Sequence, residues 1–134
     1  MELLASGLAT SPSRLSELHL EVNQVGDLGA AALGAAFAVG ASVATLYLNV
    51  NVVTCEGAIA LSDGIKVSTS LSRLFLAVNG IGDDGARALA QAIEINRSLS
   101  LLDLRLNVCL SDESRYDLRT RAARSRGAAL KCEL

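Results

Sequence analysis

Apolar and polar residues alternate along this chain in a pattern that returns every 28 positions. Each copy has two apolar residues separated by one other residue, followed after two more residues by an asparagine. Alternation of this kind predicts a strand, with both apolar residues on one face. A fixed period of about 20 to 50 residues is typical of a solenoid, in which stacked units share one core. The four copies run from Leu18 to Asn23, Leu46 to Asn51, Leu74 to Asn79 and Leu102 to Asn107.

The second half of each unit has apolar residues three or four positions apart, which predicts a helix. We expect Asp27 and Asp83 to cap two of these helices at their N-terminal ends. Strands lie about 4.8 Å apart whereas helices need roughly 8–10 Å. The stack should therefore curve, with strands on the concave side and helices on the convex side. The expected helical core positions are Ala30, Leu33 and Phe37, then Ala58, Leu61 and Ile65, then Ala86, Leu89 and Ile93.

The asparagine that closes each strand is predicted to be structural. A buried side-chain amide can both donate to and accept from backbone groups of neighbouring turns, which satisfies polar atoms that a bend leaves inside the stack. We therefore expect a structural asparagine ladder of Asn23, Asn51, Asn79 and Asn107.

The third unit carries the pattern most fully. From Leu71 to Leu89 it has the form L-x-x-L-x-L-x-x-N-x-I-x-x-x-G-x-x-x-L. Residues 15–110 therefore resemble the leucine-rich repeat family, in its ribonuclease-inhibitor-like type, and are similar to the repeats of NOD-like receptors and Ran GTPase-activating proteins. The resemblance implies an α/β fold, a right-handed leucine-rich repeat solenoid of horseshoe shape. It also implies protein–protein recognition, usually in the cytoplasm, without catalysis by the repeats.

The 28-residue frame divides the chain into units. We expect a leucine-rich repeat domain over 1–110, with units near 15–42, 43–70 and 71–98, a partial unit 99–110 and a partial leading unit 1–14. The pattern ends after Asn107, where Glu113 and Asp117 replace the expected glycine and leucine. Residues 111–134 are basic and are interpreted as a C-terminal cap or tail. Neither end has an obvious polar cap, which is expected if the chain is part of a longer repeat array.

Composition supports an intracellular repeat protein. Apolar residues make up 51% of the 134 residues but aromatic residues only 3%, so the core should consist of aliphatic side chains and alanine. The net charge of −2 selects no class of partner. Cys55, Cys109 and Cys132 are odd in number and lack metal-binding spacing, which favours a reducing, cytoplasmic location. Cys109 occupies a position that is aliphatic in the other units, where we expect a small buried side chain.

The uncharged segment from Leu28 to Leu48 is long enough to be considered for a membrane span. The 28-residue register continues through it without a break, which favours a repeat helix followed by the next strand. This helix, at Gly29–Ala41, lacks the polar outer residues of its counterpart two units later.

The exposed strand positions are the candidate binding site. Tyr47 and Phe75 fall in one column of the predicted concave face. Aromatic residues on a rigid surface often anchor interfaces, although the two rings could instead simply stack on each other across adjacent strands. A second apolar row, formed by Val22, Val50, Val78 and Leu106, is either a contact surface or turn packing. The candidate protein-binding residues are His19, Tyr47, Phe75, Asp103, Glu17, Glu21, Asn49, Arg73 and Arg105.

The sequence contains no recognisable catalytic, metal or cofactor motif, and none of these is expected. His19 is the single histidine and has no cysteine or histidine at ligand spacing. The basic C-terminal segment lacks the interleaved aromatic residues that would favour nucleic acid. We therefore expect a non-catalytic module that binds a protein partner on its concave face, and no small-molecule substrate, nucleic acid or membrane. The alternative is the regulatory leucine-rich repeat domain of a GTPase activator or NOD-like sensor. The C-terminal basic residues are Arg115, Arg119, Arg121, Arg124, Arg126 and Lys131.

Overall fold

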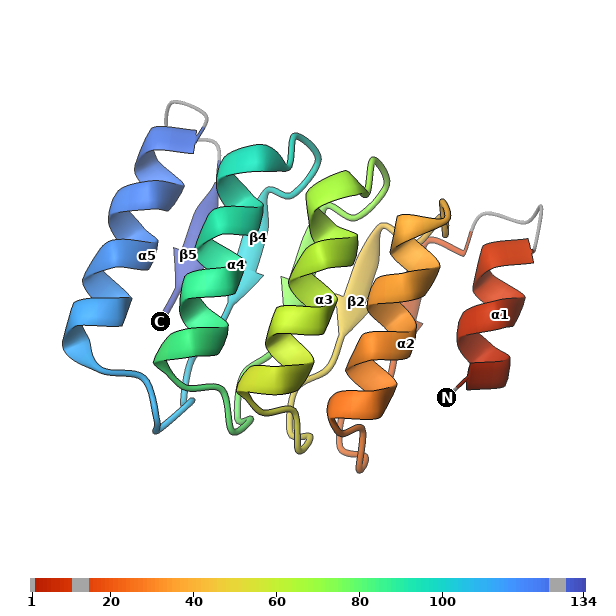
Figure 1. The fold of residues 1–134 in the computed structure, drawn as a ribbon, viewed down its shortest axis with the longest axis horizontal. Helices are drawn as coiled ribbons and strands as arrows, with labels where there is room; N and C mark the ends of the chain where they lie inside the picture. The colour runs from red at the N-terminus through yellow and green to blue at the C-terminus, as the bar shows by residue number, and fades with distance from the viewer. Residues whose placement is uncertain (1, 11–14, 126–129) are drawn as a thin grey trace.

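The computed structural model describes residues 2–10, 15–125 and 130–134, in which helices and strands alternate along the chain. The helices form one layer and the strands form a second layer behind it (Figure 1). Figure 1 also shows that the two chain ends lie at opposite ends of the stack. The helices are α1 (Glu2–Thr10), α2 (Asp27–Ala38), α3 (Cys55–Val67), α4 (Asp83–Ile95) and α5 (Asp112–Ser125), and the strands are β1 (Glu17–His19), β2 (Thr45–Tyr47), β3 (Arg73–Phe75), β4 (Leu101–Asp103) and β5 (Lys131–Glu133).

The strands form one open parallel sheet in the order β1-β2-β3-β4-β5. Leu18 pairs with Leu46, Leu46 with Leu74, and Leu74 with Leu102, so the 28-residue period of the sequence is the register of the sheet. The predicted α/β leucine-rich repeat solenoid, with strands on one side and helices on the other, is therefore confirmed.

The core lies between the two layers. Leu46, Leu74 and Leu102 point into it from the strands and are fully buried. Leu33, Leu61 and Leu89 meet them from the helices and are also buried. Aliphatic side chains fill this space at every level, because each unit repeats the same apolar positions and buries them against its neighbours.

The predicted helix caps are wrong in detail. Asp27 is the first residue of α2, and Gly26 in front of it makes no side-chain capping bond. The Asp27 carboxylate instead accepts hydrogen bonds from the backbone N–H groups of Thr54 (2.8 Å) and Gly57 (2.9 Å), at the start of the next helix. Asp83 likewise accepts from the backbone N–H of Ser111 at 2.9 Å. Each aspartate therefore caps the helix of the following unit, because the stacked helices start at the same height.

The C-terminal segment packs as a further unit of the stack. Leu118 and Ala122 of α5 are buried, and β5 pairs with β4. Leu101 pairs with Lys131, a step of 30 rather than 28, so this strand falls outside the repeat frame of the sequence. Arg126 lies outside the described residues, and the division of the chain at residue 110 stays a prediction.

Two further expectations concern Cys109 and the apolar segment from Leu28 to Leu48. Cys109 is exposed rather than buried, and Leu110 beside it enters the core instead. The apolar segment is divided between α2 and β2. None of the helices in the described part of the chain is both long and apolar enough to cross a membrane.

Candidate functional site on the strand face

The strand face is the surface of the sheet that points away from the helices, and three rings form a stack on it. The rings of His19 and Tyr47 lie 4.3 Å apart between centroids and are 11° from parallel. The rings of Tyr47 and Phe75 lie 4.8 Å apart and are 7° from parallel. The spacing matches the distance between adjacent strands, because the sheet register places the three residues side by side.

Stacking does not hide these rings. His19 is exposed, while Tyr47 and Phe75 are half-buried. Both interpretations of the aromatic column therefore apply: the rings stack on each other, and all three remain at least partly exposed. A rigid aromatic surface of this kind suits an interface, because it needs little ordering when a partner binds.

The β1 end of the strand face is acidic. His19 Nδ1 lies 2.9 Å from Glu21 and Nε2 lies 3.3 Å from Glu17. The hydrogen bond to Glu21 is the main reason that the pKa of His19 is raised above its ordinary value, despite the opposing effect of burial. The same hydrogen bond lowers the pKa of Glu21. One carboxylate oxygen of Glu21, Oε2, is buried without a hydrogen-bond partner.

Arg73 connects β3 to β1 across the intervening strand. Its Nε donates to Thr45 Oγ1 at 3.0 Å, and a terminal nitrogen lies 3.3 Å from Glu17. Thr45 is buried beneath it, although its strand position predicts exposure. Glu17, Thr45 and Arg73, which lie side by side on adjacent strands, are therefore connected by their own side chains.

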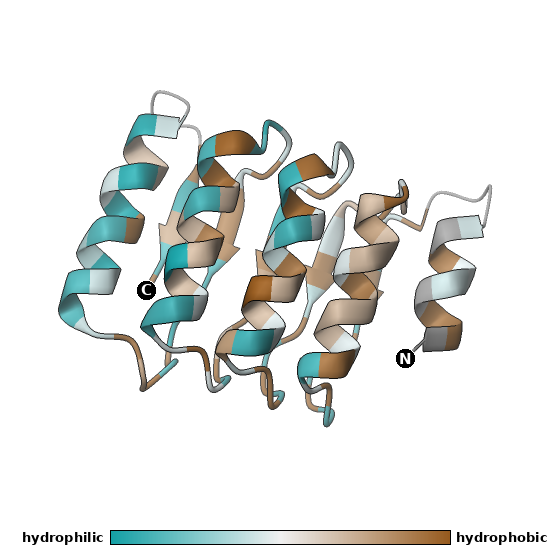
Figure 2. Ribbon diagram, in the orientation of Figure 1, coloured by the Kyte–Doolittle hydropathy of each residue, from teal (hydrophilic) through white to brown (hydrophobic). Residues whose placement is uncertain are grey.

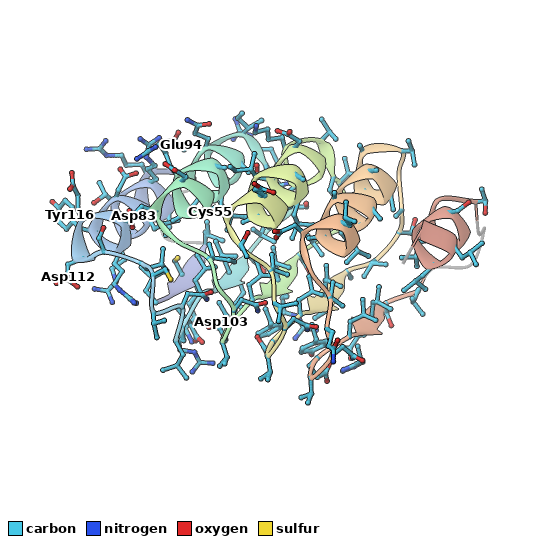
Figure 3. All side chains as sticks on the ribbon, turned by 60° about the horizontal axis from the view of Figure 1, so that its bottom comes forward. Cys55, Asp83, Glu94, Asp103, Asp112 and Tyr116 are labelled. Carbon is cyan, nitrogen blue, oxygen red and sulfur yellow. The ribbon has the colours of Figure 1, made fainter. Side chains whose placement is uncertain are left out.

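Asp103, at the β4 end of the strand face, was expected to be exposed, and this expectation is wrong. This carboxylate is only 1% exposed, because Arg105 lies over it with Nε and Nη2 at 2.9 and 2.8 Å from its two oxygens. Arg105 also approaches Glu133 of β5 at 3.3 Å. Asp103 is labelled in Figure 3, where it lies on the opposite side of the molecule from Glu94 and Tyr116. Arg105 is thus the exposed side chain at this end, and its guanidinium is held in position by ion pairs with Asp103 and Glu133.

The candidate residue Asn49 lies in the loop that follows β2 and is half-buried. Its side-chain oxygen accepts a hydrogen bond from the backbone N–H of Ala77 at 2.8 Å. Ala77 is itself buried at this level. Asn49 therefore connects two adjacent loops.

The asparagine side chains connect successive units. Asn79 accepts from the backbone N–H of Val53 at 3.0 Å and donates to the carbonyls of Leu48 and Leu76 at 2.9 and 3.0 Å. Asn51 and Asn107 make the equivalent bonds, at 2.9 to 3.1 Å. Asn23 is exposed and donates only to carbonyls of its own turn.

The described residues contain no group of three or more side chains suited to hold a metal ion. Burial raises the pKa of Cys132 to about 11, so this thiol is protonated at neutral pH and is a poor nucleophile. Cys55 accepts a backbone hydrogen bond from Gly82 at 3.3 Å.

Sequence reasoning missed the contribution of β5 to this face. Lys131 and Glu133 extend two of the strand columns and form an ion pair with each other. The usable signal was Cys132-Glu133-Leu134, which has the strand alternation of Leu102-Asp103-Leu104. The two extra residues before it moved this strand out of register with the repeat.

Comparison with known proteins agrees with this architecture. A family model described as leucine-rich repeat matches residues 14–34 and 67–90. These two segments are leucine-rich repeats, and the whole chain has the fold of a leucine-rich repeat solenoid. Among solved structures, it is similar to leiomodin-1 actin-binding site 2, with a TM-score of 0.78 and 14% identity over 96% of this chain and 75% of that one. At that identity the likeness shows the fold alone. No curated protein sequence matches the chain.

Proposed function

We propose that this leucine-rich repeat chain is a non-catalytic module that binds a protein partner on its strand face. The observation that carries the proposal is the stack of His19, Tyr47 and Phe75, which places three partly or fully exposed rings in one row. Charged groups lie on both sides of this row, with Glu17 and Glu21 at one end and Arg105 at the other. Such an arrangement provides an apolar anchor with charges that orient the partner.

Two further observations support the ribonuclease-inhibitor-like type of repeat and a cytoplasmic location. Each complete unit holds one short strand and a helix of 12 to 14 residues, which fits the ribonuclease-inhibitor-like type. The thiols of Cys55, Cys109 and Cys132 are all free, as expected for a reducing compartment. We therefore propose a cytoplasmic location for the module. Fractionation of cells that express the full-length protein would test this, and recovery in the secreted fraction would contradict it.

The binding proposal is tested by capture of partners with the tagged chain, followed by quantitative mass spectrometry. Tyr47→Ser combined with Phe75→Ser should remove the proteins captured by the wild type. The circular dichroism spectrum should stay unchanged, because both rings are only half-buried.

The matched control removes two exposed apolar side chains from the helix side, with Ile59→Ser and Val67→Ser in α3. This variant should still capture the same proteins. Capture that survives the ring substitutions but is lost in the control would move the site to the helix face and overturn the proposal.

A further inference from the structure

The residue before each ladder asparagine has an unusual backbone conformation. Val22, Val50, Val78 and Leu106 have φ angles of 55°, 56°, 56° and 59°. This left-handed region is unfavourable for residues with a side chain, and most of all for β-branched ones such as valine. We call these four residues the apolar rim. They lie in the loops that lead from each strand to the next helix, along the lower edge of the molecule in Figure 1.

The turn needs this backbone but not these side chains. The N–H groups of Val22, Val50 and Val78 donate to carbonyls of the next unit at 2.9 to 3.0 Å, and any residue can supply that donor. Asparagine or glycine would adopt the same φ with much less strain. The left-handed backbone conformation therefore disfavours the aliphatic residues that occupy these positions.

Core packing does not explain the choice either. The four side chains are 73%, 44%, 40% and 70% exposed, in chain order. Val52 and Val108, two residues further along two of the same loops, are 56% and 86% exposed. Strained backbone that persists at an exposed apolar row points to a function outside the folded chain.

The rim has the dimensions of a helix-binding surface. Its residues repeat at the strand spacing of about 4.8 Å, close to the helical pitch of about 5.4 Å. A helix lying across the loops can therefore place one apolar side chain between each pair of rim residues, with anchors at every third or fourth position.

The charges beside the rim set a direction for that helix. Glu21 precedes Val22 at the β1 end, and Arg105 precedes Leu106 at the β4 end. The uncharged Asn49 and Ala77 occupy the same position in the two units between them. Glu21 is paired with His19, and Arg105 with Asp103 and Glu133, but both side chains remain partly exposed, at 39% and 56%. A helix that begins near Glu21 and ends near Arg105 places its positive end beside this carboxylate and its negative end beside this guanidinium.

We propose that the apolar rim docks an amphipathic helix of a partner protein, with the start of the helix at Glu21 and its end at Arg105. The proposal rests on the proposed protein-binding function and adds a second contact surface beside the ring stack. The rim variant replaces all four rim residues with asparagine. Because asparagine tolerates the left-handed backbone, the melting temperature should stay unchanged or rise. A clear fall would show that the aliphatic side chains serve the fold, which would overturn the proposal.

Binding can be tested with a displayed library of 16-residue helical peptides that are randomised at positions i, i+3, i+4 and i+7. Peptides selected on the wild-type chain should be apolar at these positions and become helical when bound. Their affinity for the rim variant should fall by about tenfold or more. The matched control places asparagine at four exposed apolar positions of the helix side and should bind normally: Leu28, Val39, Val67 and Ile95.

Several results would overturn the proposal. They are a failure to select any peptide, selected peptides that bind in an extended form, and affinity that is equal for the rim variant. Rim-dependent binding to vesicles of phosphatidylcholine and phosphatidylserine in place of peptide would assign the surface to lipid. A selected peptide that loses affinity only for the Tyr47→Ser, Phe75→Ser variant would contradict the rim and leave the proposed function intact.

Discussion

The loops and the helix layer of this molecule repeat in different ways. In the loops, Asn51, Asn79 and Asn107 each accept a hydrogen bond from a backbone N–H of the preceding unit, so this contact recurs in three successive units. In the helix layer, the outer residue of one position changes from Ala35 to Asp63 in the next unit. Buried backbone groups accept only a partner of the right shape, whereas an outer helix position faces water and tolerates many residues.

The helix layer also changes its means of packing along the stack. Gly34 and Gly64 let α2 and α3 approach until a Cβ atom on either would meet the backbone of the other helix. At the other end, Arg121 of α5 pairs with Glu94 of α4 at 3.0 Å. The change is visible in Figure 2, where α2 is mostly apolar, α4 has both hydrophilic and apolar residues, and α5 is largely hydrophilic. The helices therefore meet through small residues at one end of the stack, whereas an ion pair on the surface accompanies the apolar contacts at the other.

The close approach of α2 and α3 gives the largest expected effect. Gly64→Ala puts a methyl group against the carbonyl of Gly34. Because backbone cannot move aside as a flexible side chain can, the helices must separate. We expect a loss of about 3 kcal/mol in unfolding free energy, measured by urea denaturation. The control is Gly7→Ala in α1, where a Cβ meets nothing within 4 Å; it should be neutral or stabilising by up to about 1 kcal/mol. Equal stability of the two variants would refute the tight contact.

The asparagine ladder gives the next effect. Asn79→Ala leaves backbone groups of Val53, Leu48 and Leu76 without partners, so we expect a loss of about 1–3 kcal/mol. Asn23→Ala should lose less than about 1 kcal/mol, because Asn23 is exposed and contacts only its own turn. Thermal unfolding of both variants measures the difference. An unchanged melting temperature for Asn79→Ala would contradict its role between units.

The Asp27 carboxylate, which caps the helix of the next unit, should contribute less to stability than Asn79, and its contribution should fall in acid. Burial raises the pKa of Asp27, but hydrogen bonds from Thr54 and Gly57 outweigh it and lower the pKa below 3.8. A lowered pKa means that the charged carboxylate stabilises the fold above about pH 4 and loses this effect as the pH falls through the folded pKa. Asp27→Ala should therefore lose about 1 kcal/mol at pH 7 and progressively less in acid. A loss that stays constant down to the acid limit would rule out the charged cap.

The smallest effect concerns His19. Its pKa, followed by NMR titration of the ring protons, should lie above 6.5 because Glu21 and Glu17 favour the charged ring. Its contribution to stability is complete below pH 6.5 and disappears as the pH rises through the raised value. Glu21→Gln should move the pKa back toward 6.5. A titration that is the same in both proteins would show that the hydrogen bond to Glu21 is not formed in solution.

Much of the fold could be predicted because the same residues recur at one spacing. Leu46, Leu74 and Leu102 differ by the repeat length, so one correct assignment places all three. The last unit escaped prediction because Cys132 is 30 positions after Leu102, and a frame of 28 residues has no place for it. The repeat spacing predicted which candidate site residues lie side by side on adjacent strands. It could not predict that Asp103 is buried, because this burial depends on Arg105 folding back over it.

The sequence by itself determined the repeat, the strand register and the positions of the core, since these follow from periodic burial of apolar residues. It also placed His19, Tyr47 and Phe75 in one column. Only the tertiary structure decided that Asp27 caps the following helix rather than its own. It also decided that the rim residues have a left-handed backbone. Both features depend on how one unit packs against the next. The sequence pattern within a single unit does not specify the relative position of two units.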